Sequence, residues 1–360
     1  MSDRHPVSPR LAEMVTRRFG VVVASEEPML GDASTRRYVR VRLQGRGAPS
    51  SLVAMVMQDR EAAKLSDEVG EVGESEEIPY VNVHHFLTRC GVDVPELYVD
   101  ASDEGVLLLE DIGDIPLWDA VAAAPEAEVH RLFGLAIEQL LRLQVDGMSR
   151  RDGACVAFRR TFDRALYEWE FEHFIEWGFT GRVEGSLPAG ELAELRRHFG
   201  EIAAFLDEQP RVLNHRDFHA WNLFVQGSDR IRVIDFQDAL LAAAPYDLAT
   251  LLGDRVTPRA VSPSLERALV RDYGDAWSQR PGAAWIWDHE QLWQVYTACA
   301  LQKAFKVVGR FHFLDKVKGK PGYLVFLPPT LERIRGLLVD RPDLGSVWAI
   351  LQRYFPELRP

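Results

Sequence analysis

The sequence predicts an α+β fold with two lobes, a small β-rich N-terminal lobe and a larger α-helical C-terminal lobe. In the first 110 residues, short apolar segments rich in β-branched residues alternate with turn-forming clusters, as is typical of strands. From residue 111 onward, apolar residues recur at helical spacing. A length of 360 residues also suits two lobes. We therefore expect lobes of residues 1–110 and 111–360.

Four strands and one or two helices are expected in the N-terminal lobe. The strands are separated by turn-forming residues, and they are Val39–Leu43, Ser51–Met57, Glu96–Val99 and Val106–Glu110. Apolar spacing predicts a helix over Val81–Cys90, and the acid-rich stretch Asp67–Glu77 is expected to form a surface loop. Together these elements predict a small, mostly antiparallel sheet with a helix packed on it.

Helices dominate the expected C-terminal lobe. In the first of them, Val129, Leu132, Phe133 and Ala136 follow the spacing of one helix face. The expected helices are Glu128–Val145, Phe162–Trp177, Glu191–Leu206, Ser264–Trp277, His289–Val308 and Leu331–Val339. Because they outnumber the strands of this region, we expect the second lobe to be largely helical.

Composition limits the classes of partner. The 54 acidic residues outnumber the 42 basic ones, which gives a net charge of −12 and argues against a nucleic-acid partner. No apolar run is long enough to cross a bilayer, so no membrane partner is expected. Cys90, Cys155 and Cys299 are scattered, and we expect them to be small buried side chains in a reducing compartment. These observations favour the cytoplasm.

The most informative pattern surrounds a predicted hairpin. Leu223–Val225 and Ile231–Ile234 are short apolar strands joined by a Gly-Ser-Asp turn. Asn222 immediately precedes the first strand and Asp235 immediately follows the second. In an antiparallel pair these positions lie at the same end, about 5 Å apart. Two oxygen-bearing side chains would then converge, as a hard cation such as Mg²⁺ requires.

Asp217 lies in the loop that leads into the same end of the hairpin. A carboxylate near the metal could accept a proton from an attacking hydroxyl. The alternative is that Asp217, Asn222 and Asp235 are ordinary turn residues beside a hairpin. His215 and His219 are expected to shape the loop rather than to act as bases.

The pattern His215-x-Asp217-x-x-x-x-Asn222, with Asp235-Phe236 after a hairpin, resembles the catalytic loop and metal-binding motif of protein kinases. The resemblance implies a bilobal protein-kinase-like fold and the use of ATP and Mg²⁺. It also implies that Asp217 is the catalytic base and that Asn222 and Asp235 hold the metal.

A narrower resemblance follows from the residues around this motif. His215–Asn222 and Ile234–Ala239 look like the aminoglycoside phosphotransferase and choline kinase superfamily, since Gln237-Asp238 stands where protein kinases carry glycine. Within that superfamily, the chain resembles the bacterial kinases that phosphorylate the anomeric hydroxyl of N-acetylmuramate and N-acetylglucosamine in cell-wall recycling. Four further segments carry this likeness: Gly31–Tyr38, Leu107–Gly113, Asp163–Trp177 and Leu301–Leu324.

Nucleotide contacts are expected in the first of these segments and at the hinge. The proposed phosphate loop consists of Gly31, Asp32, Ala33 and Ser34, whose backbone amides and one hydroxyl could approach phosphate oxygens. A plain hairpin turn is the alternative. Arg36 and Arg37 alternate across a strand, so at most one should face the nucleotide, and we select Arg37. The resemblance places adenine beside the backbone of Glu110 and Ile112.

One departure from the kinase pattern is the lack of a lysine in the third strand, which reads Ser51–Met57. The amino-sugar kinases look similar here, whereas the antibiotic kinases carry the lysine. The cation that holds the phosphates is therefore open among Arg36, Arg37 and Arg40. A degenerate kinase that binds nucleotide without turnover would also lack the lysine.

Acceptor-binding residues are expected on three elements: Asp238, Glu170, Glu176 and Arg310. Asp238 could accept a hydrogen bond from a sugar hydroxyl, or it could be a turn residue. Arg310 is a candidate partner for a lactyl carboxylate. Glu168, Glu172 and Glu176 form an acidic stripe, which is either a solvated helix face or a surface for a cationic aminoglycoside. Asp247 either anchors the catalytic loop from beneath or caps a helix.

The sequence thus predicts an ATP-dependent small-molecule kinase, with the anomeric hydroxyl of N-acetylmuramate or N-acetylglucosamine as the acceptor. One alternative is a kinase for an aminoglycoside, choline or another small alcohol. The other is a catalytically dead regulator that binds a nucleotide or a sugar.

Overall fold

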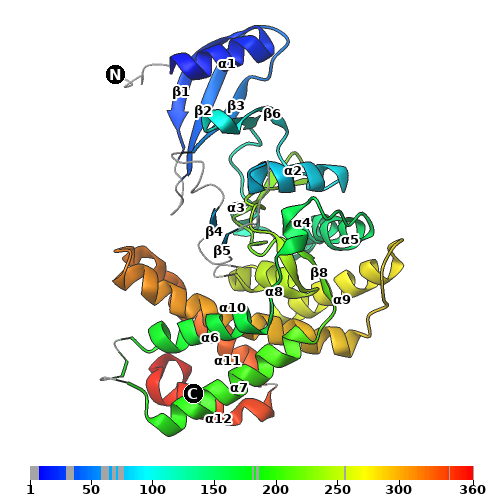
Figure 1. Ribbon diagram of the computed structural model, residues 1–360. Helices are drawn as coiled ribbons and strands as arrows, with labels where there is room; N and C mark the ends of the chain where they lie inside the picture. Colours follow the sequence, from blue (N-terminus) through cyan, green and yellow to red (C-terminus); the bar gives the residue numbers. More distant parts are fainter. Residues whose placement is uncertain are drawn as a thin grey trace.

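The structure is a computed structural model that describes residues 8–29, 36–57, 65–66, 70–71, 77–180, 182–183, 186–254, 257–339 and 341–359. In Figure 1 a β-sheet with one helix lies at one end of the molecule, and a group of helices lies at the other. The expected α+β class is confirmed.

The N-terminal sheet has five strands in the order β1-β2-β3-β7-β6. All four neighbouring pairs are antiparallel. The strands are β1 (Val22–Pro28), β2 (Arg36–Gln44), β3 (Ser51–Met57), β6 (Leu97–Ala101) and β7 (Val106–Glu110). The four expected strands are therefore confirmed, and β1 is an addition. Two short strands, β4 (Leu65–Ser66) and β5 (Gly70–Glu71), pair with each other.

The two faces of this sheet pack against different partners. Helix α1 (Pro9–Phe19) covers one face, where Leu11 and Val15 join Val41 of β2 in a small apolar core. The opposite face, which carries Met55 and Leu107, belongs to the main core of the protein. Because successive strand residues point to opposite faces, this division follows directly from the sequence of each strand.

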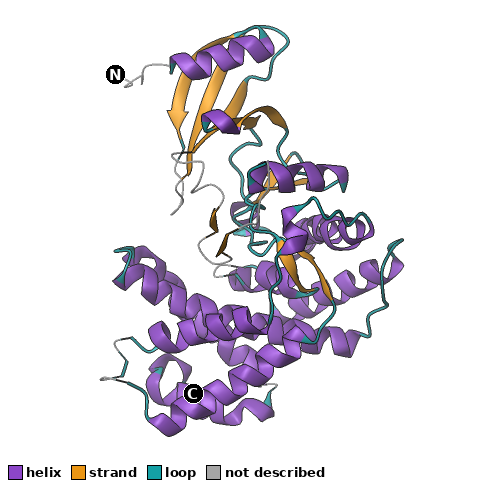
Figure 2. Cartoon of the chain, in the orientation of Figure 1, coloured by secondary structure: helices purple, strands orange, loops and turns teal. Residues whose placement is uncertain are grey.

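The rest of the described chain is mostly helical, as Figure 2 shows. The helices are α2 (Pro79–Arg89), α3 (Leu117–Val121), α4 (Glu126–Leu141), α5 (Gly147–Ser149), α6 (Arg164–Gly178), α7 (Ala189–Asp207), α8 (Tyr246–Gly253), α9 (Pro263–Gln279), α10 (His289–Lys316), α11 (Leu327–Val339) and α12 (Gly345–Tyr354). Each helix that the sequence predicts is present. A two-lobe division after residue 110 remains a prediction; β7 ends at Glu110.

Two antiparallel ribbons lie among these helices. Strands β9 (Leu223–Gln226) and β10 (Arg230–Val233) form the expected hairpin. Strand β8 (Arg211–Asn214) pairs with β11 (Leu240–Ala243). In the sequence, β8 precedes the hairpin and β11 follows it. The loops between the four strands carry Asp217 and Asp235.

Helix α10 extends eight residues beyond its predicted end at Val308. Gly309, the first residue beyond the predicted end, lies where α10 crosses α6. A Cβ atom at Gly309 would be 2.8 Å from backbone atoms of His173 and Phe174. The glycine therefore serves the close approach of two helices rather than the end of one.

Three smaller expectations can also be compared with the structure. All three cysteines are buried and unbonded, as predicted. Most of the acid-rich stretch Asp67–Glu77 lies outside the described residues. Within the described part of the chain, no helix combines the length and apolar character that crossing a membrane requires.

Candidate active site

The end of the β9–β10 ribbon brings two of the predicted residues together. Leu223 pairs with Val233 at this end. One step further, the amide of Ile234 donates a hydrogen bond of 3.0 Å to the carbonyl oxygen of Asn222. Asp235 follows directly. Asn222 and Asp235 thus share one end of the ribbon, as the sequence predicts.

Asp217 lies beside them. The Nδ2 atom of Asn222 donates to the backbone oxygen of Asp217 over 3.0 Å, which leaves the Oδ1 atom of Asn222 as its acceptor atom. The side chains of Asp217 and Asp235 are 42% and 44% exposed, respectively. Both carboxylates are therefore accessible to small molecules, as catalysis at this end of the ribbon would require.

Strained backbone holds these side chains in position. Arg216 and Asp235 have φ angles of 80° and 64°, in the left-handed region that non-glycine residues rarely occupy. The Nε2 atom of His215 lies 2.8 Å from the carbonyl oxygen of Ile234 and so connects the two loops. Strain of this kind persists where the surroundings enforce it, and it is common at functional sites.

Asp247 supplies part of that enforcement. Its buried carboxylate accepts hydrogen bonds from the backbone amides of His215 and Arg216. Burial raises the pKa of Asp247 to about 6, although the charge of His215 and the two amides act in the opposite direction. Helix α8 begins at Tyr246 with Pro245 as its N-cap. Asp247 is therefore the anchor beneath the catalytic loop, and the capping alternative is wrong.

Lys303 of α10 is a functional candidate whose place beside Asp217 the sequence did not predict. Its Nζ atom lies 3.2 Å from Oδ1 of Asp217 and donates to the carbonyl oxygen of Arg216 over 3.2 Å. Burial acts to raise the pKa of Asp217, but the charges of Lys303 and Lys306, with those of Arg216 and His219, hold that pKa well below its usual range. The carboxylate is thus kept ionised and able to accept a proton.

Glu170 supports this cluster from within the protein. Its side chain is fully buried, and its carboxylate contacts Nζ of Lys306 at 2.6 Å and Nε2 of Gln302 at 2.6 Å. The expectation that Glu170 touches the acceptor is corrected, because no surface of its side chain is open to a ligand. It instead fixes α6 to α10 close to Asp217.

Asp238, the expected acceptor residue near the metal position, lies next to Asp235. The Nε2 atom of Gln237 donates to Asp235 over 2.9 Å and to Asp238 over 3.2 Å. The guanidinium of Arg160 donates to the carbonyl oxygen of Gln237 over 2.7 Å. The loop after β10 therefore presents two neighbouring carboxylates on a fixed backbone.

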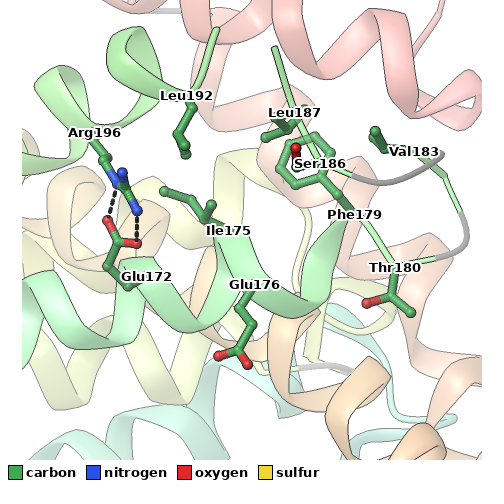
Figure 3. Close-up of a pocket in the computed structure, with 10 residues that line it drawn as sticks. All are labelled: Glu172, Ile175, Glu176, Phe179, Thr180, Val183, Ser186, Leu187, Leu192 and Arg196. Atoms are coloured by element: carbon green, nitrogen blue, oxygen red, sulfur yellow. Dashed lines mark hydrogen bonds and ion pairs between the residues drawn. The ribbon is translucent and has the colours of Figure 1, made fainter. Parts of the chain in front are cut away.

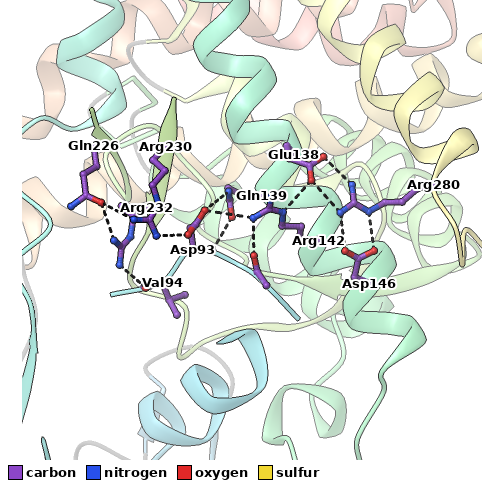
Figure 4. A network of polar contacts seen from close by, with 11 residues as sticks. Asp93, Val94, Glu138, Gln139, Arg142, Asp146, Gln226, Arg230, Arg232 and Arg280 are labelled. Atoms are coloured by element: carbon purple, nitrogen blue, oxygen red, sulfur yellow. Dashed lines mark hydrogen bonds and ion pairs between the residues drawn. The ribbon is translucent and has the colours of Figure 1, made fainter. Parts of the chain in front are cut away.

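Polar contacts attach the ribbon to the segment before β6, as Figure 4 shows. Arg230 forms an ion pair of 2.7 Å with Asp93, and Arg232 donates to the carbonyl oxygen of Val94 over 2.7 Å. The amide of Val233 also donates to the backbone of Asp93 over 2.8 Å. The ribbon that carries Asn222 and Asp235 at its end is thus attached to the segment that leads into the N-terminal sheet.

The hinge candidates occupy the end of β7. The carboxylate of Glu110 pairs with Arg232, and its backbone amide donates to the carbonyl oxygen of Glu96 over 2.8 Å. Both groups thus already have partners within the protein. Ile112 is buried. Adenine binding at Glu110 and Ile112 remains a prediction.

The arginines of β2 point in different directions. The Nη1 atom of Arg36 lies 3.9 Å from Oδ1 of Asp235. Arg37 is exposed on the opposite face of the strand. Arg40 forms ion pairs with Asp111 at 2.8 Å and with Asp114 at 2.6 Å. Arg36, rather than the selected Arg37, is therefore the arginine that reaches Asp235, the expected metal ligand.

The expected phosphate loop, Gly31, Asp32, Ala33 and Ser34, lies outside the described residues. Its role in nucleotide binding remains a prediction.

Two other acceptor candidates, Glu176 and Arg310, make no described contact with Asp217. Glu176 lines a cavity of about 610 Å³ between α6 and α7, and Figure 3 shows its carboxylate turned away from the apolar lining. In the same cavity, Glu172 forms an ion pair of 2.7 Å with Arg196. Arg310 lies over the ring of Phe313 at 5.3 Å. The acidic stripe is thus partly neutralised by arginine, and neither Glu176 nor Arg310 contacts the catalytic loop in a described interaction.

The chemistry of the donor set fits Mg²⁺ bound together with phosphates. Across the described residues, no group of three or more histidine, cysteine, aspartate or glutamate side chains forms a metal site. Asp235 and Asn222 instead offer one carboxylate and one amide oxygen. Mg²⁺ commonly takes one or two such protein ligands, with water and substrate phosphates completing its coordination.

Comparison with known proteins agrees with this geometry. A family model described as the phosphotransferase enzyme family matches residues 26–285, well over half of the chain. The chain belongs to this family.

Its relatives within the phosphotransferase enzyme family include proteins named N-acetylmuramate/N-acetylglucosamine kinase. The one from Pseudomonas putida is 31% identical over 278 residues, which are 76% of each chain. The one from Caulobacter vibrioides is 29% identical over 349 residues, which are 92% of each chain. The chain is therefore a small-molecule kinase.

The fold is shared with more distant phosphotransferases. The ADP-bound crystal structure of aminoglycoside phosphotransferase APH(2'')-Ib superposes with a TM-score of 0.58 at 15% identity, and the match covers 91% of this chain and 98% of the other. This likeness confirms the kinase-like fold that the catalytic motif implied.

Proposed function

We propose that this phosphotransferase uses ATP and Mg²⁺ to phosphorylate the anomeric hydroxyl of an N-acetylated amino sugar, N-acetylmuramate or N-acetylglucosamine, in the recycling of cell-wall sugars. The observation that carries the proposal is the arrangement of Asp217, Asn222 and Asp235 at one solvent-exposed end of the ribbon. The names of the relatives support this choice of acceptor. A cytoplasmic location fits, because three unbonded cysteines suit a reducing compartment.

Asp217 is the proposed general base. Its carboxylate accepts the proton of the sugar hydroxyl while the hydroxyl oxygen forms a bond to the γ-phosphorus. The bond between that phosphorus and the β,γ-bridging oxygen breaks, and ADP leaves. Lys303 keeps Asp217 ionised and adds positive charge where the transferred group carries negative charge.

Asn222 and Asp235 are the proposed metal ligands, and bound Mg²⁺ would neutralise charge on the phosphates. Asp238, next to Asp235, is the nearest expected acceptor contact and could accept a hydrogen bond from a sugar hydroxyl. Arg310 and Glu176 are more distant candidates. Among them, only Arg310 could pair with the carboxylate that distinguishes N-acetylmuramate.

One experiment separates the possible acceptors. The protein is incubated with MgATP and a panel of amino sugars, aminoglycosides and choline, and phosphorus NMR identifies the phosphorylated position. We expect an acid-labile sugar 1-phosphate. Product at another hydroxyl, or on an aminoglycoside or choline, would favour the alternative of a different small-molecule kinase.

Variants test the mechanism. Asp217→Asn should reduce the rate at least ~100-fold, as expected for loss of a general base, while nucleotide affinity is retained. Asp229→Asn, in the exposed turn at the far end of the same ribbon, is the matched control and should keep wild-type activity. An unimpaired Asp217→Asn enzyme would contradict the mechanism. Thermal stabilisation by ATP or sugar without ATP consumption would instead identify a regulator.

A further inference from the structure

Strand β3 carries no cation where kinases of related fold place a phosphate-binding lysine. It reads Ser51–Met57, and both methionines at its end are buried. Met55 pairs with Tyr38 of β2, and Met57 pairs with Arg36. Directly paired residues point to the same face of a sheet, so Arg36 and Tyr38 share the face of Met55. On that face, Arg36 of the neighbouring strand β2 therefore supplies the positive charge that β3 lacks.

Arg36 is directed toward the loop that carries Asp235. Its Nη1 atom lies 3.9 Å from Oδ1 of Asp235, and its side chain is only 14% exposed. This separation exceeds the usual 2.7–3.2 Å of an N–H···O hydrogen bond, so Arg36 and Asp235 form an ion pair rather than a hydrogen bond with each other. Phe236, the next residue, packs on Tyr80 of α2 with ring centroids 4.8 Å apart. The loop is thus fixed opposite Arg36.

The electrostatic surroundings of Tyr38 agree with this placement. Burial raises the pKa of Tyr38, and the tyrosine also experiences the opposing charges of Arg36 and Asp235. One cation, one carboxylate and two tyrosines (Tyr38 and Tyr80) therefore form a compact group between β2 and the metal position.

The other arginines of β2 are directed elsewhere. Arg40 pairs with Asp111 and Asp114 beyond the end of β7. Arg42 lies 3.4 Å from Glu27 of β1. Arg37 is exposed on the face opposite Arg36. Within strand β2, Arg36 is thus the arginine whose described ion pair reaches the proposed metal site.

We propose that Arg36 is the residue that binds the nucleotide phosphates, in place of the lysine that β3 lacks. The proposal rests on the use of a nucleotide proposed above. A metal at Asp235 would bring the phosphates to the position that Arg36 faces. A guanidinium can donate two parallel hydrogen bonds to phosphate oxygens, which suits this role better than a single ammonium group.

Binding measurements without an acceptor test the role of Arg36 independently of turnover. Isothermal titration calorimetry with Mg²⁺ compares adenosine, AMP, ADP and ATP as ligands of the wild type, Arg36→Ala, Arg36→Lys and the control Arg37→Ala. We expect Arg36→Ala to weaken ADP and ATP about 10- to 100-fold, the range of a charged hydrogen bond, and to leave adenosine unchanged. Arg36→Lys should recover part of the loss, and Arg37→Ala should bind as the wild type does.

The outcomes separate this inference from the proposed function. If Arg36→Ala binds ADP and ATP as tightly as the wild type, the assignment to Arg36 is wrong, while nucleotide use stands. If the wild type binds none of the four ligands or their guanosine counterparts, the proposed function itself fails. Circular dichroism monitors folding, and Arg36→Gln, which keeps most of the length and polarity, replaces Arg36→Ala if the latter does not fold.

Discussion

Replacing Lys303 by methionine measures what the cation beside Asp217 contributes to phosphoryl transfer. Methionine keeps most of the side-chain length but removes the charge. The two groups are 3.2 Å apart, and their side chains are 14% and 42% exposed. At an effective dielectric constant of about 20, unit charges at this distance attract by about 5 kcal/mol. Screening at the exposed carboxylate reduces this, and exposed pairs retain about 1 kcal/mol or less.

We therefore expect the Lys303→Met variant to lose about 1–3 kcal/mol of transition-state stabilisation, or roughly 5- to 150-fold in kcat/KM. The pH profile should change as well. Burial raises the pKa of Asp217, and Lys303 is the first of the cations that lower it. Without Lys303 the pKa rises, and the ionised base is lost at a higher pH. The acid limb of kcat/KM should then shift to higher pH.

The assay is nucleotide consumption measured at constant ionic strength from about pH 3 to pH 8, so that it reaches the acid limb of the wild type. Lys303→Arg keeps the charge and should leave the acid limb near that of the wild type. Lys318→Met removes a charge from an exposed position and serves as the control. If Lys303→Met changes neither the rate nor the acid limb, Lys303 only packs against the loop, and the reasoning is refuted.

Three further variants probe the structure that holds the site. The raised pKa of Asp247 contributes stability that is fully present below pH 3.8 and is lost as pH rises through about 6, with a loss on the order of 1 kcal/mol between pH 5 and pH 8. Urea unfolding at these two pH values should lack this loss in Asp247→Asn, and an unchanged pH dependence would contradict the assignment. Lys306→Met leaves Glu170 buried without its cation and should lower the free energy of unfolding by about 3–5 kcal/mol. The double variant with Glu170→Gln should recover most of this loss, and a single variant as stable as the wild type would argue against the pair. Gly309→Ala should lower stability by about 1–3 kcal/mol because its Cβ meets the backbone of α6, whereas Gly336→Ala on α11, with open space around it, should raise stability by up to about 1 kcal/mol. Thermal unfolding compares the two variants, and equal effects would refute the close helix crossing.

The proposed catalytic and metal-binding residues could be placed together from the sequence because their geometry is local. Asp217, Asn222 and Asp235 lie within 19 positions of one another, and a short hairpin alone brings the last two to one end. Register and turn chemistry are encoded in the same few residues. Helix α1 also has local signals, with Ser8-Pro9 at its start and Gly20 at its end, which could have revealed it.

Long-range pairs could not be derived in this way. Lys303 and Asp217 are 86 positions apart, and Glu170 and Gln302 are 132 apart. These contacts depend on how α10 packs against α6 and the catalytic loop, which no local pattern specifies. The same packing explains why α10 continues past its predicted end at Val308, since a glycine that permits helix contact has the same sequence signature as one that ends a helix.

The ion pair between Glu110 and Arg232 limits rigid-body movement of the N-terminal sheet relative to the helices. It joins the last residue of β7 to β10, and Arg232 is almost fully buried. A swing that began at residue 110 would separate the pair and leave a buried guanidinium without its counter-charge, at a cost of about 3–5 kcal/mol. Any movement of the sheet relative to the ribbon should therefore keep Glu110 and Arg232 together. Binding and release of ligands would then proceed while the spacing between β7 and the ribbon stays constant.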